Sequence, residues 1–370
     1  MKKANAVLAA LVIAMAFVAS APAASYYFVG GGADDNWSTD DNWQGGTAPT
    51  LTNSDTVYIK TTTSVVDQAY VIQKLVLDSS VAGDAVLSGS GQLTIDGNLA
   101  ADSILIDNQA AGRDFKLDGT YVLDNTASNG KKNHIQSSGS STSSLTFGAS
   151  STTTMSDHVY TAASTSKTYY FDGTITTGST LRKIVGDVTF GASANNNNAF
   201  MGEMNSANIV VNTANFKDGG SLTATWTTTL TLNAADCLAN RPVLDTDAAF
   251  TLNANANADF GTLDLSSGNT RTMLFNLGTA VTALTFSDSS GLDWGDETMS
   301  ITGFKDSVVR FGTDANALTP QQLSQIVADG VGAAGVMLDT NGWLIAVPEP
   351  ATMVLLGLGG VFVAIRRRRG

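Results

Sequence analysis

The fold is decided by residues 186–232, "GDVTFGASANNNNAFMGEMNSANIVVNTANFKDGGSLTATWTTTLTL". Three short β-branched segments recur in it, Asp187–Gly191, Asn208–Val211 and Thr229–Leu232, and turns rich in Gly, Asn and Ser separate them. Apolar side chains fill every second position of each segment, as Leu230 and Leu232 do. A period of two is typical of a β-strand with one buried face.

The spacing of these segments carries more information than any one of them. Strand centres near residues 189, 210, 231 and 251 lie about 20 residues apart, and centres near 264 and 285 show a similar step. A fixed step of this length is typical of a solenoid, in which each rung stacks on the one before it. We therefore predict an all-β fold, a right-handed parallel β-helix. The alternative is a β-sandwich, because some gaps between segments are as short as the 8–12 residues typical of that fold.

The same pattern predicts further strands and suggests a cover for each end. Trp37 and Trp43 are expected to lie over the first rung. Near the other end, Thr319 is expected to be the N-cap of a short helix with Pro320 at N1 and Gln322 at N3, which forms a capping box. Val336–Leu338 and Trp343–Ile345 flank a turn sequence and predict a hairpin. The further predicted strands are Thr56–Ile59, Tyr70–Leu77, Gln92–Asp96, Ser103–Asp107, Leu145–Gly148, Phe250–Leu252, Thr262–Leu265 and Ala283–Phe286.

The N-terminus is typical of a secretory signal peptide. Lys2 and Lys3 precede an apolar stretch over Ala6–Val18, and small residues follow at Ala21 and Ala23. These features predict export and cleavage after Ala23, give or take one residue. The predicted divisions of the chain are a signal peptide (1–23), a β-solenoid body (24–310), a C-terminal cap of helix and hairpin (311–346) and a membrane segment (347–370).

The C-terminus predicts a membrane stop. Ala351–Ile365 is uninterrupted and apolar, and as a helix it would span about 22 Å, less than the ~30 Å of a bilayer core. Four basic residues follow it directly: Arg366, Arg367, Arg368 and Arg369. The positive-inside rule keeps such a cluster in the cytoplasm, so the body is expected to face outward.

The tail Val347–Gly370 resembles the PEP-CTERM sorting signal of exosortase substrates in Gram-negative bacteria. The likeness rests on Pro348, Glu349 and Pro350, on the apolar stretch Met353–Ile365, and on the arginine cluster. It implies transient retention in the inner membrane and processing by an exosortase-like membrane enzyme. It also implies a final place at the cell surface or in the extracellular matrix, with a link to exopolysaccharide and biofilm.

Two further segments resemble PEP-CTERM proteins with autotransporter-type β-strand repeats. One is the closing segment, with Phe311–Asp314 and Asn341–Leu344 among its matching residues, and the other is the opening segment around Trp37 and Trp43. That group has no assigned catalytic residues, so the resemblance implies no active site.

The charge of the chain restricts its partners. The net charge is −13, and removing residues 1–23 and 348–370 leaves 14 basic and 32 acidic residues, a net charge of −18. A surface this acidic repels nucleic acid and anionic membranes, so neither is expected as a partner of the exported body.

The residues able to carry chemistry are few, and we expect neither a cofactor, a metal site nor an enzyme. The two histidines, His134 and His158, lack the spacing of a zinc site, and Cys237 is expected to be a small buried residue. Trp226 could stack on sugar rings or lie in the core. The acidic groups are interpreted as solvated turn residues, with weak calcium binding near Asp34–Asp41 as an alternative; they are Asp34, Asp35, Asp40, Asp41, Asp245, Asp247, Asp293, Asp296 and Glu297.

The sequence thus favours an exported structural or interaction protein. It would pass through an inner-membrane-tethered intermediate to the cell surface or matrix. The alternatives left open are a polysaccharide-binding module and a polysaccharide-active enzyme on the same β-helix.

Overall fold

Parallel β-strands dominate the structure. The computed structural model describes residues 23–97, 103–124, 133–139, 142–155, 159–161, 168–177, 183–196, 203–214, 221–224, 226–238, 242–246, 249–265, 271–332 and 335–347. Its elements are β1 (Ser25–Phe28), the 3-10 helix η1 (Asp40–Asn42), β2 (Thr56–Ile59), β3 (Thr63–Val65), β4 (Tyr70–Ile72), β5 (Lys74–Leu77), β6 (Ala85–Asp96), β7 (Ser103–Asn108), β8 (Asp114–Asp124), β9 (Asn133–Gln136), β10 (Ser144–Phe147), β11 (Thr152–Met155), β12 (Val159–Thr161), β13 (Thr168–Phe171), β14 (Thr174–Thr177), β15 (Lys183–Phe190), β16 (Asn195–Asn196), β17 (Glu203–Val211), β18 (Ser221–Ala224), β19 (Thr228–Leu232), β20 (Val243–Thr246), β21 (Phe250–Ala254), β22 (Ala258–Asp259), β23 (Leu263–Asp264), β24 (Thr272–Leu277), β25 (Leu284–Phe286), β26 (Thr298–Thr302), β27 (Val309–Phe311), the helix α2 (Pro320–Ser324), β28 (Ile326–Ala328), β29 (Val336–Leu338) and β30 (Leu344–Ala346).

The strands pair in three parallel series, and strands that follow one another along the chain generally belong to different series. The first runs through β1, β2, β5, β7, β9, β12, β15, β17, β18, β20 and β23. The second, called the central series below, runs through β3, β6, β8, β10, β13, β15, β17, β19, β21, β24, β26 and β28. The third runs through β4, β6, β8, β11, β14 and β16, and the separate sheet β22, β25 and β27 is also parallel.

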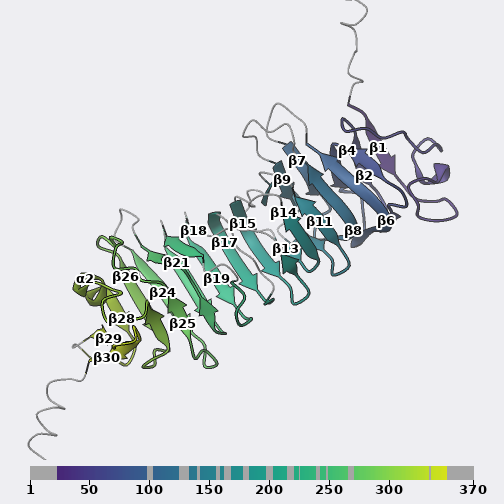
Figure 1. Ribbon diagram of the computed structural model, residues 1–370. Helices are drawn as coiled ribbons and strands as arrows, with labels where there is room; N and C mark the ends of the chain where they lie inside the picture. Colours follow the sequence, from purple (N-terminus) through teal and green to yellow (C-terminus); the bar gives the residue numbers. More distant parts are fainter. Residues whose placement is uncertain are drawn as a thin grey trace, which may run out of the picture.

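This topology is β-helix-like. Figure 1 shows the strands following one another along an elongated stack from the N-terminal to the C-terminal end. The alternative of a β-sandwich is wrong, because that fold is built from antiparallel sheets and every pair in the 25-stranded sheet is parallel.

The predicted step along the chain is confirmed in the central series. Val188 pairs with Ile209, Ile209 with Leu230, and Leu230 with Leu252. The expected match of the strands near 264 and 285 is wrong, because β25 pairs with β22 and β27 while β23 pairs with β20. The two strands were matched by spacing alone, and spacing does not show which series a strand joins.

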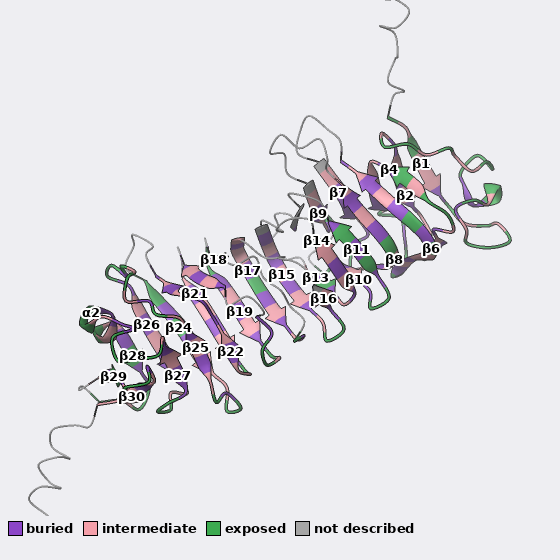
Figure 2. Ribbon diagram, in the orientation of Figure 1, coloured by how far each residue is buried: buried purple, intermediate pink, exposed green. Residues whose placement is uncertain are grey.

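The inward side chains form a continuous apolar core between the strand series. Aromatic rings stack from rung to rung, with centroids 5.0 Å apart for Phe147 and Phe171 and 5.5 Å apart for Phe171 and Phe190. Figure 2 shows the alternation of buried and more exposed positions along strands such as β21 and β24. The period of two seen in the sequence therefore separates core from surface.

At the N-terminal end, an aromatic cluster packs beside β1. Trp37 and Trp43 are buried, their ring centroids lie 5.6 Å apart, and the Trp43 indole Nε1 donates to the Trp37 carbonyl. The backbone around Trp43 forms an antiparallel bridge to Phe28 on the outer edge of β1. The hydrogen-bonding groups of that edge are thus used within the chain.

At the C-terminal end, the predicted helix and hairpin are both confirmed. The Thr319 side chain accepts from the Gln322 amide N–H, and the Gln322 side chain accepts from the Thr319 N–H, which completes the capping box of α2. β29 and β30 form an antiparallel hairpin. Its backbone reaches the edge of β27, where the Phe311 N–H donates to the Gly342 carbonyl.

Among the described residues, no helix is both long enough and apolar enough to cross a membrane. The predicted signal helix and the predicted transmembrane helix over 351–365 lie outside the described residues, so both stay predictions. The predicted strand Tyr70–Leu77 is two strands, because the chain turns from the third series into the first at Gln73.

Candidate functional site

The most regular surface of the body is the outward face of five strands in the central series, β17, β19, β21, β24 and β26. Each strand contributes two side chains, and the parallel register places them in two columns across the strands. We call these ten positions the uncharged strip. They are Asn208, Thr229, Thr251, Leu274 and Ser300 in one column, and Val210, Thr231, Asn253, Asn276 and Thr302 in the other.

Hydrogen bonds between side chains run along this strip from strand to strand. The Asn276 amide nitrogen donates to the Asn253 amide oxygen at 2.8 Å, and the Asn253 nitrogen donates to the Thr231 hydroxyl at 3.2 Å. Each amide keeps a second N–H and a second lone pair for other partners. Thr231, Asn253 and Asn276 therefore present donors and acceptors whose positions these hydrogen bonds fix.

A second ladder follows the ends of the same strands. The Asn233 amide nitrogen donates to the Asn212 oxygen at 2.8 Å, and the Asn255 nitrogen donates to the Asn233 oxygen at 2.8 Å. These residues are 21 and 22 apart in the chain, one rung each.

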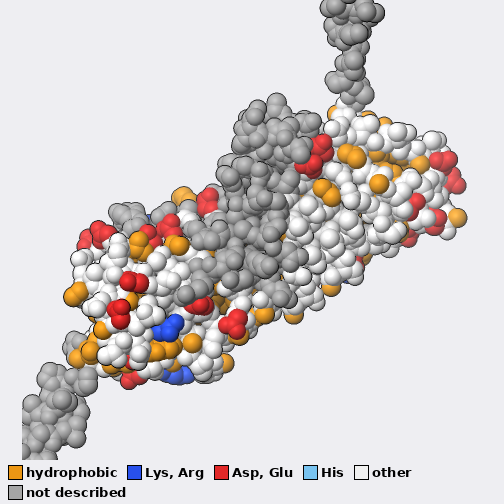
Figure 3. All heavy atoms as spheres, viewed as in Figure 1, with side chains coloured by type: hydrophobic (Ala, Val, Ile, Leu, Met, Phe, Trp, Pro, Cys, Tyr) orange, Lys and Arg blue, Asp and Glu red, His pale blue; other side chains and the backbone are white. Residues whose placement is uncertain are grey.

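Charge is absent from the strip although the body is strongly acidic. None of its ten residues is Asp, Glu, Lys or Arg. The strip is bounded by Asp187, which pairs with Asn208, and by Val327, which pairs with Ser300. Figure 3 shows the acidic side chains of the face in view in separate small groups, both at the N-terminal end and over the C-terminal half.

One large aromatic side chain is exposed at the start of β19. Trp226 has 63% of its surface exposed and lies two residues before the first residue of that strand. The interpretation of Trp226 as a core residue is therefore wrong. Contact of Trp226 with a sugar stays a proposal.

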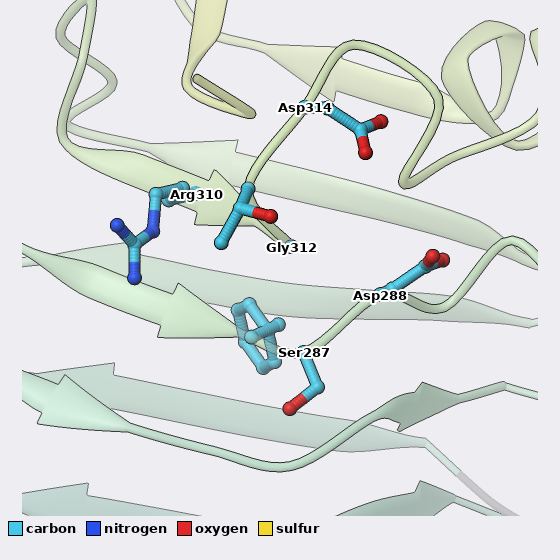
Figure 4. A pocket seen from close by; sticks show the side chains of 7 residues that line it. Ser287, Asp288, Arg310, Gly312 and Asp314 are labelled. Carbon is cyan, nitrogen blue, oxygen red and sulfur yellow. The ribbon is translucent and has the colours of Figure 1, made fainter.

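A small pocket of about 230 Å³ lies near the C-terminal end, where β25 and β27 finish. Figure 4 shows Arg310 on one side of it and Asp288 and Asp314 on the other. The Arg310 guanidinium lies 5.3 Å from the centre of the Trp343 ring, a cation–π contact. The pocket is lined by Phe286, Ser287, Asp288, Arg310, Gly312, Thr313 and Asp314.

The carboxylates of this pocket are held by their own turns. The Asp288 carboxylate accepts from the Ser290 hydroxyl at 2.7 Å and from its amide N–H at 2.9 Å, and these hydrogen bonds lower the Asp288 pKa. The Asp314 carboxylate accepts from the Asn316 N–H at 2.7 Å. A general acid in glycoside hydrolysis needs a raised pKa, so Asp288 is poorly suited to that role.

The acidic group at the N-terminal end is likewise used in local hydrogen bonds. Asp34 accepts from the side chains of Thr39 and Asn36 and from the Asn36 N–H, and these bonds lower the pKa of its exposed carboxyl group. Asp40 accepts from the Ala48 N–H. Among the described residues, no group of three or more His, Cys, Asp or Glu side chains is arranged to hold a metal ion.

The other sequence candidates lie apart from one another. Cys237 is buried, as predicted, and His134 lies in β9. Glu297 is buried and accepts from the Arg271 N–H, so its interpretation as a solvated turn residue is wrong. Asp293 accepts from the Gly295 N–H at the surface. His158 and Asp247 lie outside the described residues.

The predicted sorting residues fall at or beyond the two ends of the described chain. Ala23 is exposed and lies two residues before the first residue of β1, whereas Ala21 lies outside the described residues. At the other end, the Val347 N–H donates to the Gly335 carbonyl at 2.9 Å, so the folded body continues to the residue before Pro348. Pro348, Glu349, Pro350 and Arg366–Arg369 lie outside the described residues.

Comparison with known families identifies the C-terminal segment. The profile of the PEP-CTERM protein-sorting motif matches residues 346–369. The chain carries a PEP-CTERM sorting signal. This signal marks an exported protein that an exosortase, a membrane enzyme, processes on the way to the cell surface. No curated protein and no solved structure matches the chain.

The match overlaps the folded body of this PEP-CTERM protein. Ala346, the first matched residue, is the last residue of β30, and its N–H donates to the Asp306 carboxylate at 2.8 Å. The sorting signal therefore begins where the terminal hairpin ends. Sequence reasoning found the signal but missed the uncharged strip, whose only trace is the alternation of Thr and Asn in "TTLTL" and "FTLNA".

Proposed function

We propose that this PEP-CTERM protein is a structural component of the cell surface or extracellular matrix of a Gram-negative bacterium, and that its uncharged strip binds a neutral polysaccharide. Its body would be a right-handed parallel β-helix of the autotransporter-repeat type, with the aromatic cluster and the α2–hairpin unit as end caps. The observation that carries the proposal is the uncharged strip, in which eight of the ten side chains carry a hydroxyl or an amide group.

The geometry of the strip suits a repeating polymer. Adjacent strands of a sheet lie about 4.8 Å apart, and every second residue along a strand lies about 6.7 Å apart. The five strands of the strip therefore offer hydroxyl and amide groups at eight of ten positions of a two-dimensional repeat, which Val210 and Leu274 interrupt. A polymer of hydroxylated units lying across the strands could repeat the same contacts on each rung.

The lack of charge on the strip favours a neutral polysaccharide as its ligand. A body of net charge −18 repels an anionic polysaccharide at long range, whereas a neutral one meets no such barrier. Thr, Ser and Asn can donate and accept, as sugar hydroxyls do. The hydrogen bonds along the strip already fix the side chains of Asn253 and Asn276. Binding of a polysaccharide would therefore cost less side-chain entropy.

A non-enzymatic role is part of the proposal. The strip holds no titratable side chain, and the carboxylates near the pocket are engaged in turn hydrogen bonds. A glycoside hydrolase would need a carboxyl group kept protonated near neutral pH. Turnover of any polysaccharide by the purified body would contradict this part.

Retention on an insoluble neutral polysaccharide tests the binding surface. Thr251→Glu places a charge in the middle of the strip and is expected to weaken retention about tenfold, the cost of losing one hydrogen-bonded contact. The matched control is Thr154→Glu on β11, an exposed strand position in the third series. Equal retention of both variants and the wild type would place binding elsewhere.

Intact mass and cell fractionation test the sorting route. In the native host, the wild-type body is expected to lose the C-terminal helix. Replacing Pro348, Glu349 and Pro350 with alanine, or Arg366–Arg369 with serine, is expected to leave the chain uncleaved in the inner membrane. A wild-type chain that keeps its tail and stays in the membrane would mean that the tail is a permanent anchor.

A further inference from the structure

A buried aspartate lies beside the first residue of the described body. Asp55 precedes β2 and has only 4% of its surface exposed. Its Oδ1 accepts from the Ala24 N–H at 3.2 Å, and its Oδ2 accepts from the N–H and the hydroxyl of Thr52, both at 2.8 Å. All three donors are neutral groups.

In the described part of the chain, no Lys, Arg or His side chain forms an ion pair with Asp55. The two ion pairs among the described residues join Lys74 to Asp107 and Lys116 to Asp118. Asp107, with 2% of its surface exposed, is as buried as Asp55 and keeps Lys74 at 3.6 Å. Burying a carboxylate is unfavourable unless a positive charge or strong hydrogen bonds compensate. Asp55 has three neutral hydrogen bonds but no ion pair with a described side chain, so a positive charge beside it would stabilise the buried carboxylate further.

Cleavage of the signal peptide would create a positive charge next to Asp55. The small residues Ala21 and Ala23 predict cleavage of the signal peptide after Ala23, and Ala24 is the residue whose nitrogen contacts Asp55. Hydrolysis of the Ala23–Ala24 bond consumes one water molecule and leaves a carboxylate on Ala23 and an ammonium on Ala24. We propose that Asp55 is the binding site for the α-ammonium group of Ala24 in the mature chain.

The backbone around Ala24 holds the new terminus in place. The Thr56 N–H donates to the Ala24 carbonyl at 2.8 Å, and Ser25 pairs with Thr56 in the parallel ladder of β1 and β2. Cleavage replaces one neutral donor with an ammonium group of three donors at the same atom. Charge-assisted hydrogen bonds are shorter and about twice as strong as neutral ones. Removal of the signal peptide would thus strengthen the contact between the start of β1 and Asp55, which precedes β2.

The position of the cut is decisive, because the site accepts one terminus only. A chain that starts at Ala23 carries its ammonium one residue away, about 3.8 Å along the backbone, and offers Asp55 a neutral amide as before. A chain that starts at Ser25 lacks the contacting nitrogen altogether. The proposal rests on export of the chain and is independent of what the strip binds.

The mass of the exported protein is the first test. Intact mass and N-terminal sequencing of the wild type are expected to give Ala24 as the first residue. A mature chain that starts at Ala23, Ser25 or any other residue would overturn the proposal. N-terminal sequencing reads this end alone, so the result does not depend on processing of the tail.

Equilibrium unfolding tests the contact itself. Chains 24–370 and 23–370, released from fusions that leave these first residues, are compared in the same mild detergent. The unfolding constant of the 24–370 chain is expected to be about ten- to a hundredfold smaller, as for a charge-assisted hydrogen bond in a buried site. Equal unfolding constants would overturn the proposal without any substitution that endangers folding.

A double-mutant cycle assigns the difference to Asp55. Asp55→Asn keeps the size of the side chain and removes its charge, and it is made in both chains. If Asp55 binds the ammonium, the difference between the two termini disappears in the Asp55→Asn pair. If the difference persists, the terminus acts through another group and the assignment to Asp55 is wrong.

Discussion

At the residue scale, glycine shows how closely the rungs of the stack approach one another. A Cβ added to Gly91 in β6 would lie 2.1 Å from the Gln68 carbonyl oxygen, and one added to Gly89 would lie 2.2 Å from the Val66 oxygen. Both contacts are with backbone of the preceding rung, which cannot rotate away. Gly89 also has a φ of +129°, a region open to glycine alone. The register irregularity of β6 between Ser88 and Gln92 therefore depends on these two residues.

Gly91→Ala is expected to reduce the free energy of unfolding by about 3 kcal/mol or more, because the methyl group must displace backbone. Gly291→Ala is the control, since a Cβ at that position has no neighbour within 4 Å. The control is expected to change stability by less than about 0.5 kcal/mol. Chemical denaturation of the body measures both. Similar losses in the two variants would mean that rung spacing is less restrictive than the contacts indicate.

Two buried tyrosines make the stability of the body fall at alkaline pH. Burial raises the pKa of Tyr121 and Tyr169 well above the ordinary value of 10, and the Tyr121 hydroxyl donates to the Leu87 carbonyl at 2.8 Å. Above pH 10 the unfolded chain loses these protons and the native chain keeps them. Stability is therefore constant below about pH 10 with respect to these groups and falls above it, by about 1.4 kcal/mol per pH unit for each tyrosine.

Denaturation midpoints of the wild type and Tyr121→Phe between about pH 9 and pH 11 test this loss of stability. The variant is expected to be less stable at pH 9, because the Leu87 carbonyl loses a buried donor, and to show a shallower alkaline decline. Parallel declines in the two proteins would show that Tyr121 is not one of the groups that titrate.

At the scale of single elements, the helix α2 shows what local sequence determines. Thr319, Pro320 and Gln322 specify the capping box on their own, and the structure confirms it. The same Gln322 side chain also donates to the carbonyls of Ser289 and Leu292, both at 2.9 Å. These residues are about 30 positions away, so their contact could not be predicted from the helix sequence.

This double use predicts unequal costs for two substitutions. Thr319→Ala is expected to cost about 1 kcal/mol, the usual cost of losing an N-cap. Gln322→Ala is expected to cost about 2–3 kcal/mol, because it also leaves buried carbonyl groups without a donor. Thermal unfolding measures both, with Thr340→Ala in the exposed hairpin turn as a control. Equal losses would mean that the carbonyl contacts contribute nothing.

Strand series are the feature of the fold that sequence spacing cannot resolve. The alternation of apolar residues in Thr229–Leu232 or Phe250–Leu252 predicted the strands and their inward faces. The break of Tyr70–Leu77 at Gln73 was missed because an apolar run continues across the corner. The uncharged strip and the Asp55 site were missed for a related reason. Both join residues more than 20 positions apart, and only the stack brings them together.

At the scale of the whole molecule, stacking makes each rung depend mainly on its neighbours. Residues 213–233 span one rung. Asn212 and Asn233 follow β17 and β19 at equivalent places, are 21 positions apart and are joined by a side-chain hydrogen bond. Deleting 213–233 joins Asn212 to Ala234 and removes β18 and β19 together. β20 and β21 can then pair with β17 as β18 and β19 did, so every inward side chain keeps its orientation.

The shortened chain is therefore expected to keep its β-sheet circular dichroism and a cooperative unfolding transition, with a modest loss of stability from one missing rung. Deleting only 213–222 is the matched comparison. It removes part of a rung, shifts the strands that follow out of their series, and is expected to abolish cooperative unfolding. If both deletions unfold alike, the rungs are not interchangeable units, and the long-range contacts of the stack must be specific to each pair. The tail offers an independent readout, since a correctly stacked body should still end at Val347 and present the sorting signal for processing.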